Sequence, residues 1–249
     1  MPFVHTTIEN NIATVRMERG KVHALNEEHV EQLGSTFHEL EENDDAHVIV
    51  LTGTDKFFSF GLDVPELYDY KPDDFIRFIT KFTDLYSLIF IYPKPVIAAI
   101  NGYAIAGGCM LATACDWRIM MIGRYRIALN EVTFGSTVFH GAMEMLKFLC
   151  GCRRAEIIAG FGEMYSAEGA LNLGLVDDTA YEDDFNKKIL DKAAQYMSVD
   201  LTSFGAIKEL LRRPIFERMR LYEAESLQRF TDIWYSPSTR DKLKSIQIK

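Results

Sequence analysis

The pattern of apolar and polar positions predicts alternating strands and helices over the first half of the chain. Short apolar or alternating runs that end in turn residues are typical of strands. They occur at residues 12–17, 47–52, 95–100, 117–122 and 125–129. Helical spacing occurs between them, at residues 26–40, where Val30, Leu33 and Phe37 share one stripe, and at residues 72–92. This alternation favours an α/β fold.

Beyond Glu131 the pattern becomes helical. Pro214 is expected to separate two of the predicted segments, since proline interrupts a helix. Helices are predicted at residues 140–149, 153–161, 166–172, 183–197, 202–211, 215–234 and 237–247. The change near residue 200 predicts a mixed core, residues 1–199, and a C-terminal helical region, residues 200–249. Helices that extend beyond a core often pack on a neighbouring subunit, so we expect this region to mediate oligomerisation.

A glycine-rich turn lies between the strand predicted at residues 95–100 and a short apolar helix at residues 109–115. The pair Gly107-Gly108 lets a ligand approach the bare backbone, and the N–H groups of the helix start favour a negative atom there. The turn is therefore either an anion or oxyanion site with apolar walls, or a tight turn that binds nothing. Residues 96–115 carry no charge, but Asn101-Gly102 and the glycine pair break the run, which excludes a membrane-spanning helix.

The 249 residues are 48% hydrophobic and 25% charged, which describes a globular protein with a sizeable core. A formal net charge of −9 excludes nucleic acid as the main partner. A polyanionic ligand would need a local basic patch. The last twelve residues form either such a patch or an ordinary solvated helix end. They carry Arg240, Lys242, Lys244 and Lys249 against Asp241.

The four cysteines lack the spacing of a metal site, and no metal is expected. Cys109 and Cys115 lie in apolar segments and are interpreted as small core residues. The first residues show no signal-peptide pattern, and the last residues match no obvious sorting address. We therefore expect a cytoplasmic protein with reduced thiols.

Several motifs follow one another in a fixed order. They occupy residues 57–63 (FFSFGLD), 101–109 (NGYAIAGGC), 114–119 (ACDWRI), 162–167 (GEMYSA) and 174–177 (GLVD). In this order and spacing the chain resembles the crotonase superfamily, the enoyl-CoA hydratases and isomerases. The resemblance implies a spiral of ββα units with a C-terminal α-helical trimerisation region. It also implies a homotrimer or a dimer of trimers, and an acyl-CoA thioester substrate that carries its own coenzyme A, so that no separate cofactor is needed.

The resemblance assigns an oxyanion hole to the backbone N–H groups of Leu62 and Gly107. Losing one donor of such a pair typically slows catalysis by roughly 10²–10³. The family's CoA-bordering segment matches Val22, His23 and Ala24, although His23 taken alone is better explained as a surface-loop histidine. Further substrate contacts are expected at Phe60, Gly61, Asp63, Val64, Ala106 and Gly108.

Glu131 matches the family's catalytic glutamate, within a Leu129-Asn130-Glu131 string similar to that of the Δ3,Δ2-enoyl-CoA isomerases. Hydratases of the family use a second glutamate, and that position holds Met110, which cannot transfer a proton. Phe139 occupies the segment where the family positions a water. His140 is either a second proton carrier or a helix-start residue near the acyl pocket. This pocket is also expected to be lined by Phe78, Phe82, Met110 and Phe139.

The expected function is therefore an acyl-CoA isomerase that moves a 3-enoyl double bond to the 2-position. Glu131 would shuttle one proton from C2 to C4 while the two N–H groups hold the enolate oxygen. Two alternatives are a hydratase-like or other enolate-forming enzyme, and a non-catalytic acyl-CoA-binding homologue.

Overall fold

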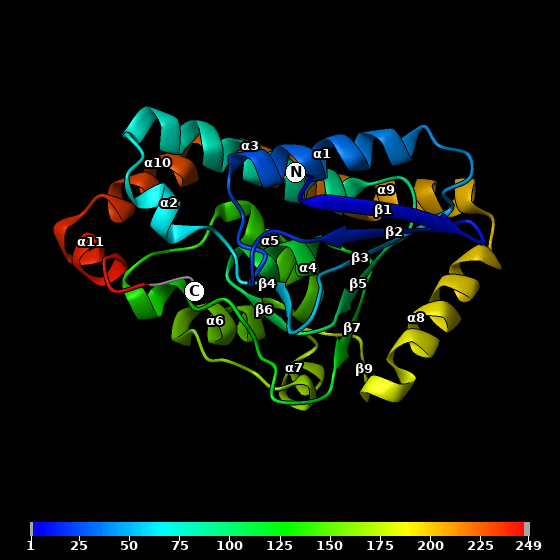
Figure 1. Cartoon of the computed structure of the whole chain (residues 1–249). Helices are drawn as coiled ribbons and strands as arrows, with labels where there is room; N and C mark the ends of the chain where they lie inside the picture. The colour runs from blue at the N-terminus through cyan, green and yellow to red at the C-terminus, as the bar shows by residue number, and fades with distance from the viewer. Residues whose placement is uncertain (1, 247–249) are drawn as a thin grey trace.

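Two sheets organise the chain in the computed structural model, which describes residues 2–246 (Figure 1). The larger has the order β1-β2-β3-β5-β7-β9, and only its β1–β2 pair is antiparallel. Its strands are β1 (Val4–Glu9), β2 (Ile12–Met17), β3 (Val48–Thr52), β5 (Val96–Ile100), β7 (Trp117–Met121) and β9 (Asp178–Ala180). The smaller is parallel and consists of β4 (Phe57–Ser59), β6 (Tyr103–Ile105) and β8 (Ile127–Ala128).

Successive repeats add one strand to each sheet and then a helix. The first repeat is β3, β4 and α3 (Pro72–Ile91), with the short α2 (Val64–Tyr68) before α3. The second is β5, β6 and α4 (Gly107–Ala114), and the third is β7, β8 and α5 (His140–Cys150). This is the spiral of ββα units that the resemblance implied, and the predicted fold class is confirmed.

The two faces of the larger sheet are covered by different helices. Side chains alternate along a strand, so Ile49 and Leu51 enter the main core while Val48 and Val50 face α8 (Glu182–Met197). On the main-core side, α1 (Glu27–Glu41) packs beside α3 (Figure 1). The remaining elements are the 3₁₀ helix η1 (Glu131–Phe134), α6 (Cys152–Phe161), α7 (Ala167–Leu173), α9 (Leu201–Leu221), α10 (Glu223–Trp234) and α11 (Pro237–Leu243).

Helix α1 forms where its sequence pattern predicted. Asn26 caps its first turn by accepting a hydrogen bond from the His29 N–H at 3.0 Å. Val30, Leu33 and Phe37 are buried on one face, as the spacing indicated. Each such side chain contributes about 1.5–3 kcal/mol on burial, so this face fixes the helix on the sheet.

Strand β1 was not predicted, because its exposed Thr6, Thr7 and Glu9 mask the apolar period. Its ladder to β2, from Val4 opposite Met17 to Glu9 opposite Ile12, supplies the missing stabilisation. The predicted break at Pro214 was also wrong. Helix α9 runs through this proline and ends only before Tyr222.

Buried side chains on one face explain why α9 continues through Pro214. Lys208, Arg212, Ile215 and Met219 recur at helical spacing on both sides of the proline, and all four are buried. The Asp116 carboxylate receives Lys208 Nζ at 2.6 Å and an Arg212 guanidinium nitrogen at 3.0 Å. These contacts hold the helix on the core and outweigh the one backbone hydrogen bond that proline removes.

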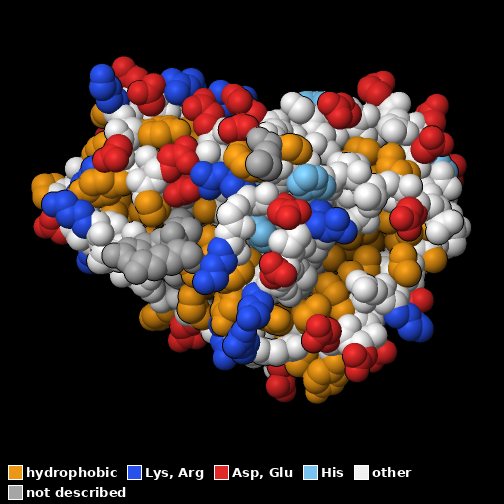
Figure 2. All heavy atoms as spheres, in the orientation of Figure 1, with side chains coloured by type: hydrophobic (Ala, Val, Ile, Leu, Met, Phe, Trp, Pro, Cys, Tyr) orange, Lys and Arg blue, Asp and Glu red, His pale blue; other side chains and the backbone are white. Residues whose placement is uncertain are grey.

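Acidic and basic side chains are mixed on the face drawn in Figure 2, with apolar side chains exposed between them. None of the helices within residues 2–246 is both long enough and apolar enough to cross a membrane. The segment that was tested as a membrane span at residues 96–115 divides into β5, β6 and α4. Cys109 and Cys115 are fully buried, as predicted, and all four cysteines are free thiols.

Candidate active site

Three loops meet at the carboxyl ends of the small parallel sheet. Leu62 follows β4, Gly107 follows β6 and Glu131 follows β8. Because β4, β6 and β8 are parallel neighbours, their carboxyl ends lie at one edge, where ligand sites of such sheets are commonly built. The three residues assigned to catalysis are thus brought to one place from distant parts of the sequence.

The backbones at Leu62 and Gly107 lie against each other. A Cβ atom on Gly61 would come within 2.8 Å of the Gly107 nitrogen, so only glycine fits there, and its φ of +84° also favours glycine. Within residues 2–246, no group accepts a hydrogen bond from the N–H of Leu62 or of Gly107. Two unpaired donors so close together can hold one negatively charged oxygen.

Ala106 turns the chain so that Gly107 can open α4. Its backbone is at φ 50° and ψ −117°, a conformation that residues with a side chain rarely adopt. The Ala106 N–H donates to the Ala128 carbonyl at 2.8 Å, which joins this strained turn to the end of β8. The strain is therefore held by sheet pairing directly beside Gly107.

Glu131 is buried and has no charged neighbour among the described residues. Its side chain is 4% exposed, and its Oε2 atom has no hydrogen-bond partner within the described part of the chain. Burial raises the pKa of Glu131 to about 8. A carboxyl group in this state can give up and take back a proton near neutral pH.

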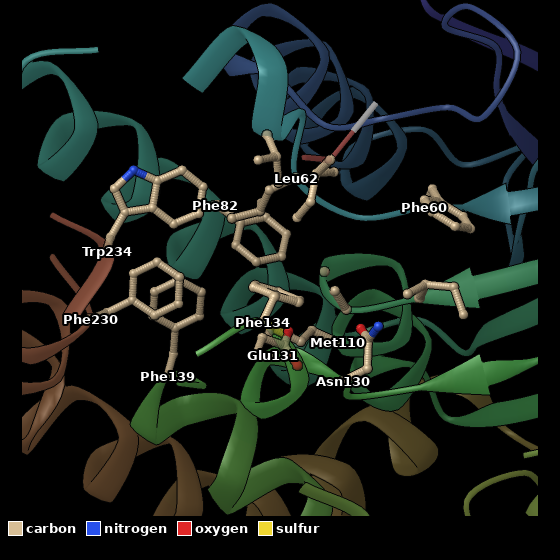
Figure 3. A pocket seen from close by; sticks show the side chains of 15 residues that line it. Phe60, Leu62, Phe82, Met110, Asn130, Glu131, Phe134, Phe139, Phe230 and Trp234 are labelled. Carbon is tan, nitrogen blue, oxygen red and sulfur yellow. The ribbon is translucent and has the colours of Figure 1, made fainter. Parts of the chain in front are cut away.

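A cavity of about 260 Å³ opens between these loops (Figure 3). Asn130 and Glu131 supply the only polar side chains among the described residues that line it. Its walls are Phe60, Leu62, Val64, Phe82, Ile105, Ala106, Gly107, Met110, Phe134, Phe139, Phe230, Trp234 and Ile246. All three residues assigned to catalysis line the cavity, as do five of those assigned to the substrate: Phe60, Val64, Ala106, Met110 and Phe139.

Val22, His23 and Ala24 lie beside this cavity without lining it. The interpretation of His23 as a surface residue was wrong, because only 1% of it is exposed. Its ring lies within hydrogen-bond distance of the Thr54 backbone and hydroxyl. The Val22 carbonyl accepts from the Phe60 N–H, so this segment supports the loop that carries Leu62.

Three further residues assigned to the substrate hold the loops in place and do not line the cavity: Gly61, Asp63 and Gly108. Asp63 caps α2 and forms an ion pair with Arg19 at 2.6 Å. Arg19 in turn donates to the Ala24 carbonyl, which ties the two loops together. A Cβ on Gly108 would meet the Ser59 carbonyl oxygen at 2.2 Å, so glycine is needed for α4 to approach β4.

His140 starts α5 but lies away from the cavity. Its N–H donates to Ser226 Oγ at 2.7 Å, and its ring packs beside Tyr222. Burial lowers its pKa. Phe78 is buried in the core and does not line the cavity, whereas Phe82 does.

Sequence reasoning missed Asn130, Phe230, Trp234 and Ile246 as cavity residues. Asn130 adjoins Glu131, and its Oδ1 has no partner within residues 2–246. Phe230 and Trp234 have helical spacing, which resembles ordinary core packing. In the basic C-terminal segment Arg240 lies over the Tyr68 ring, while Lys249 lies outside the described residues. Within residues 2–246 no cluster of three or more His, Cys, Asp or Glu side chains could hold a metal ion.

A family model described as enoyl-CoA hydratase/isomerase matches residues 7–246. The chain belongs to the enoyl-CoA hydratase/isomerase family. Among its relatives in this family is enoyl-CoA delta isomerase 1, mitochondrial, of Mus musculus, which is 26% identical over 242 residues, covering 96% of this chain and 84% of the relative. A probable enoyl-CoA hydratase of Mycobacterium avium is 30% identical over 208 residues, covering 81% of this chain and 80% of that protein.

Solved structures of the family share the fold. The crystal structure of human mitochondrial delta3-delta2-enoyl-CoA isomerase matches with a TM-score of 0.94 and 25% identity, over 98% of this chain and 96% of that one. An enoyl-CoA hydratase from Bacillus halodurans matches with a TM-score of 0.90 at 22% identity, over 98% of this chain and all of the other, which shows the fold alone. Because both isomerases are mitochondrial by name, the cytoplasmic location expected for this chain stays a prediction.

Proposed function

We propose that this protein is an enoyl-CoA isomerase that converts 3-enoyl-CoA to 2-enoyl-CoA. The observation that carries the proposal is the buried carboxyl group of Glu131, which shares one cavity with the N–H groups of Leu62 and Gly107, both unpaired within residues 2–246. Similarity to two isomerases supports the same reaction.

The mechanism follows from these groups. Ionised Glu131 removes a proton from C2 of the 3-enoyl thioester, and the electron pair moves toward the thioester oxygen. The N–H groups of Leu62 and Gly107 donate to that oxygen and stabilise the enolate. Glu131 then returns the proton to C4, and the double bond forms between C2 and C3. The proton is transferred and not consumed, so one carboxyl group suffices.

Met110 argues against hydration as the main reaction. It lies one helical turn after the start of α4 and lines the cavity, where its thioether cannot activate a water. Phe139 and Phe134 fill much of the remaining wall with aromatic carbon. Among the described lining residues, Glu131 is the sole carboxylate, whereas hydration by two carboxylates needs a second.

The coenzyme A moiety is assigned to the side of Phe60 and the segment from Val22 to Ala24. Phe60 lines the cavity, and its N–H donates to the Val22 carbonyl, which ties this segment to the loop of Leu62. The nucleotide and phosphates of coenzyme A require polar and cationic surroundings, which the cavity walls do not provide.

A homotrimer, or a dimer of trimers, is part of this proposal. Helix α9 exposes Ile207, Leu210 and Leu211 at fractions of 58%, 78% and 59%, spaced so that they share one face. Exposed apolar faces of this kind are typical of subunit interfaces. Light scattering of the purified protein is expected to give three or six times the chain mass, and a monomer would contradict the assignment.

The function is tested by supplying 3-enoyl-CoA esters and following the conjugated 2-enoyl product by ultraviolet absorbance. Water addition to crotonyl-CoA is measured in parallel. We expect isomerisation to exceed hydration by at least about 100-fold in kcat/KM. Hydration at a comparable rate would favour a hydratase, and acyl-CoA binding without turnover of either ester would favour the non-catalytic alternative.

A further inference from the structure

The cavity extends to both sides of Glu131 (Figure 3). Phe60 lies on one side of Glu131, Met110 and Leu62, while Phe139, Phe230 and Trp234 lie together on the other. The end at Phe60 borders the loops assigned to coenzyme A. The opposite end is formed by aromatic rings, and two of its three residues belong to the C-terminal helix α10.

The rings of the far end form a continuous stack. The centroids of Phe139 and Phe230 are 4.3 Å apart with an interplanar angle of 25°. Trp234 stacks on Phe75 of α3 at 4.7 Å and 26°. All four side chains are at least 98% buried. The stack thus connects α5, α10 and α3, and it is embedded in the main core rather than hinged at the surface.

Helix α11 holds this end of the cavity from behind. Thr239 Oγ1 donates to the Gly135 carbonyl at 2.6 Å, just after η1, and Thr239 is buried. The Arg240 guanidinium lies 3.4 Å from the centroid of the Tyr68 ring of α2. The segment that follows α10 is therefore fastened both to the loop of Glu131 and to the helix after Leu62. It does not leave the aromatic stack free to swing outward.

The volume of the whole cavity limits the ligand that it can hold. An apolar cavity of about 150 Å³ holds one benzene molecule, which has six carbon atoms. By that measure the 260 Å³ here hold roughly ten carbon atoms. Since the described walls contain no cation and only Asn130 and Glu131 as polar side chains, this space suits an acyl chain.

We infer that the stack of Phe139, Phe230 and Trp234 is the end wall of the acyl pocket and restricts the enzyme to medium-chain acyl thioesters of about six to ten carbons. The inference rests on the proposed function, because that function places the thioester at Glu131. Longer chains are excluded because the wall is part of the core, and opening it would break the stack on Phe75.

The test compares kcat/KM for a series of 3-enoyl-CoA esters from about six to about sixteen carbons. The wild-type protein is expected to turn over esters of up to about ten carbons best and to lose at least about tenfold for the longest. Phe230→Leu and Trp234→Phe remove ring atoms from the wall while keeping it apolar. Each is expected to raise the ratio of long-chain to medium-chain kcat/KM by about tenfold.

Phe37→Leu is the matched control. Phe37 is fully buried and packs edge-on against Tyr92, and it does not line the cavity. Phe37→Leu loses a similar amount of core packing but leaves the cavity wall unchanged. Its ratio of long-chain to medium-chain kcat/KM should therefore equal that of the wild type. Equal turnover of the longest and medium esters by the wild type would overturn the inference, and so would a change in Phe230→Leu no larger than in Phe37→Leu.

A binding series separates this inference from the proposed function. Saturated acyl-CoA esters of the same lengths are titrated calorimetrically into the wild type and into Phe230→Leu. One outcome is that no 3-enoyl ester is isomerised, while affinity still falls beyond about ten carbons and recovers in Phe230→Leu. This result would contradict the isomerase assignment and support the end wall as the limit on chain length. The other outcome is that isomerisation occurs and affinity continues to rise with chain length in both proteins. This result would support the isomerase assignment and contradict the end wall as the limit on chain length.

Discussion

Two glutamates, Glu131 and Glu144, are equally buried in this protein, and their surroundings are opposite. Each is 4% exposed. Glu144 on α5 forms ion pairs with Lys147 and, at 3.0 Å, with Arg218 of α9. Burial alone would raise the pKa of Glu144, but the hydrogen bonds from Lys147 and Arg218 outweigh it and lower that pKa. Glu131 has no such partner within residues 2–246, and burial raises its pKa to about 8.

The difference shows that burial of a carboxyl group is not enough to indicate its role. Glu144 is compensated and joins two helices, which is a structural task. Glu131 is left without compensation at the edge of a cavity, which lowers stability when it ionises and is typical of a group that transfers protons. Substitution of each glutamate by glutamine tests this difference.

The largest expected effect is on catalysis. Glu131→Gln should lower kcat by about 10³, because the amide keeps the shape of the side chain but cannot accept the C2 proton. Glu144→Gln should leave kcat within about threefold of the wild type. Steady-state kinetics with a 3-enoyl-CoA ester provide the measurement. Full activity in Glu131→Gln would remove this residue from the mechanism.

The next effect is on stability as a function of pH. The folded-state pKa of Glu131, about 8, lies above the ordinary glutamate value of 4.5, so folding favours the protonated form. This contribution is fully present below about pH 4.5 and is lost as the pH rises to about 8, at a total of roughly 3–5 kcal/mol. Glu131→Gln cannot ionise, so it should keep the stability that the wild type loses as the pH rises.

Urea unfolding of both proteins at about pH 5, 7 and 9 measures this difference, because other titrating groups contribute equally to the two chains. The free energy of unfolding of Glu131→Gln should exceed that of the wild type increasingly as the pH rises. A constant difference would mean that Glu131 ionises in the folded protein as easily as in water.

The contribution of Glu144 to the free energy of unfolding should depend on pH in the opposite direction, and it should be smaller. Its lowered pKa contributes stability above the unfolded-state value, and this stability is lost as the pH falls through the folded-state value. Lys147 and Arg218 are partly exposed and can be hydrated again after Glu144→Gln, which limits the loss to about 1–3 kcal/mol at pH 7. The same urea series measures it, and a stabilised Glu144→Gln protein would contradict the ion-pair account.

The smallest effect is expected for Glu144→Gln on the pH dependence of the rate. If ionised Glu131 is the base, kcat/KM should rise about tenfold per pH unit below the pKa and level off near pH 8. Glu144→Gln should leave this midpoint where it is. A rate that is already constant between about pH 5 and 8 would show that Glu131 is ionised throughout that range.

Much of the fold was accessible from the sequence because its signals are local. The spacing of Val30, Leu33 and Phe37 predicted α1, and the glycine pair at 107 and 108 predicted the start of α4. Pro214 shows the limit of such reasoning. The buried residues Lys208 and Arg212 bind Asp116, which is far away in the sequence, and no local pattern reveals that pairing.

The candidate site was predicted by resemblance more than by local pattern. Leu62, Gly107 and Glu131 come together only because three short strands pair in parallel, and pairing between distant segments leaves no trace in any one of them. Phe230 and Trp234 were overlooked because apolar residues at helical spacing are usually buried in a core. His23 was misjudged because its burial depends on Thr54 of another loop.

The small sheet has a consequence for how the protein can change. Its strands are only two or three residues long, yet the three loops that leave it carry the residues assigned to catalysis, while the six-stranded sheet and its helices hold most of the buried core. Apart from Gly61, Ala106 and Gly108, whose backbones allow few side chains, residues such as Glu131 in those loops can therefore be exchanged at little risk to folding. Such an arrangement lets a lineage try new reactions one loop at a time.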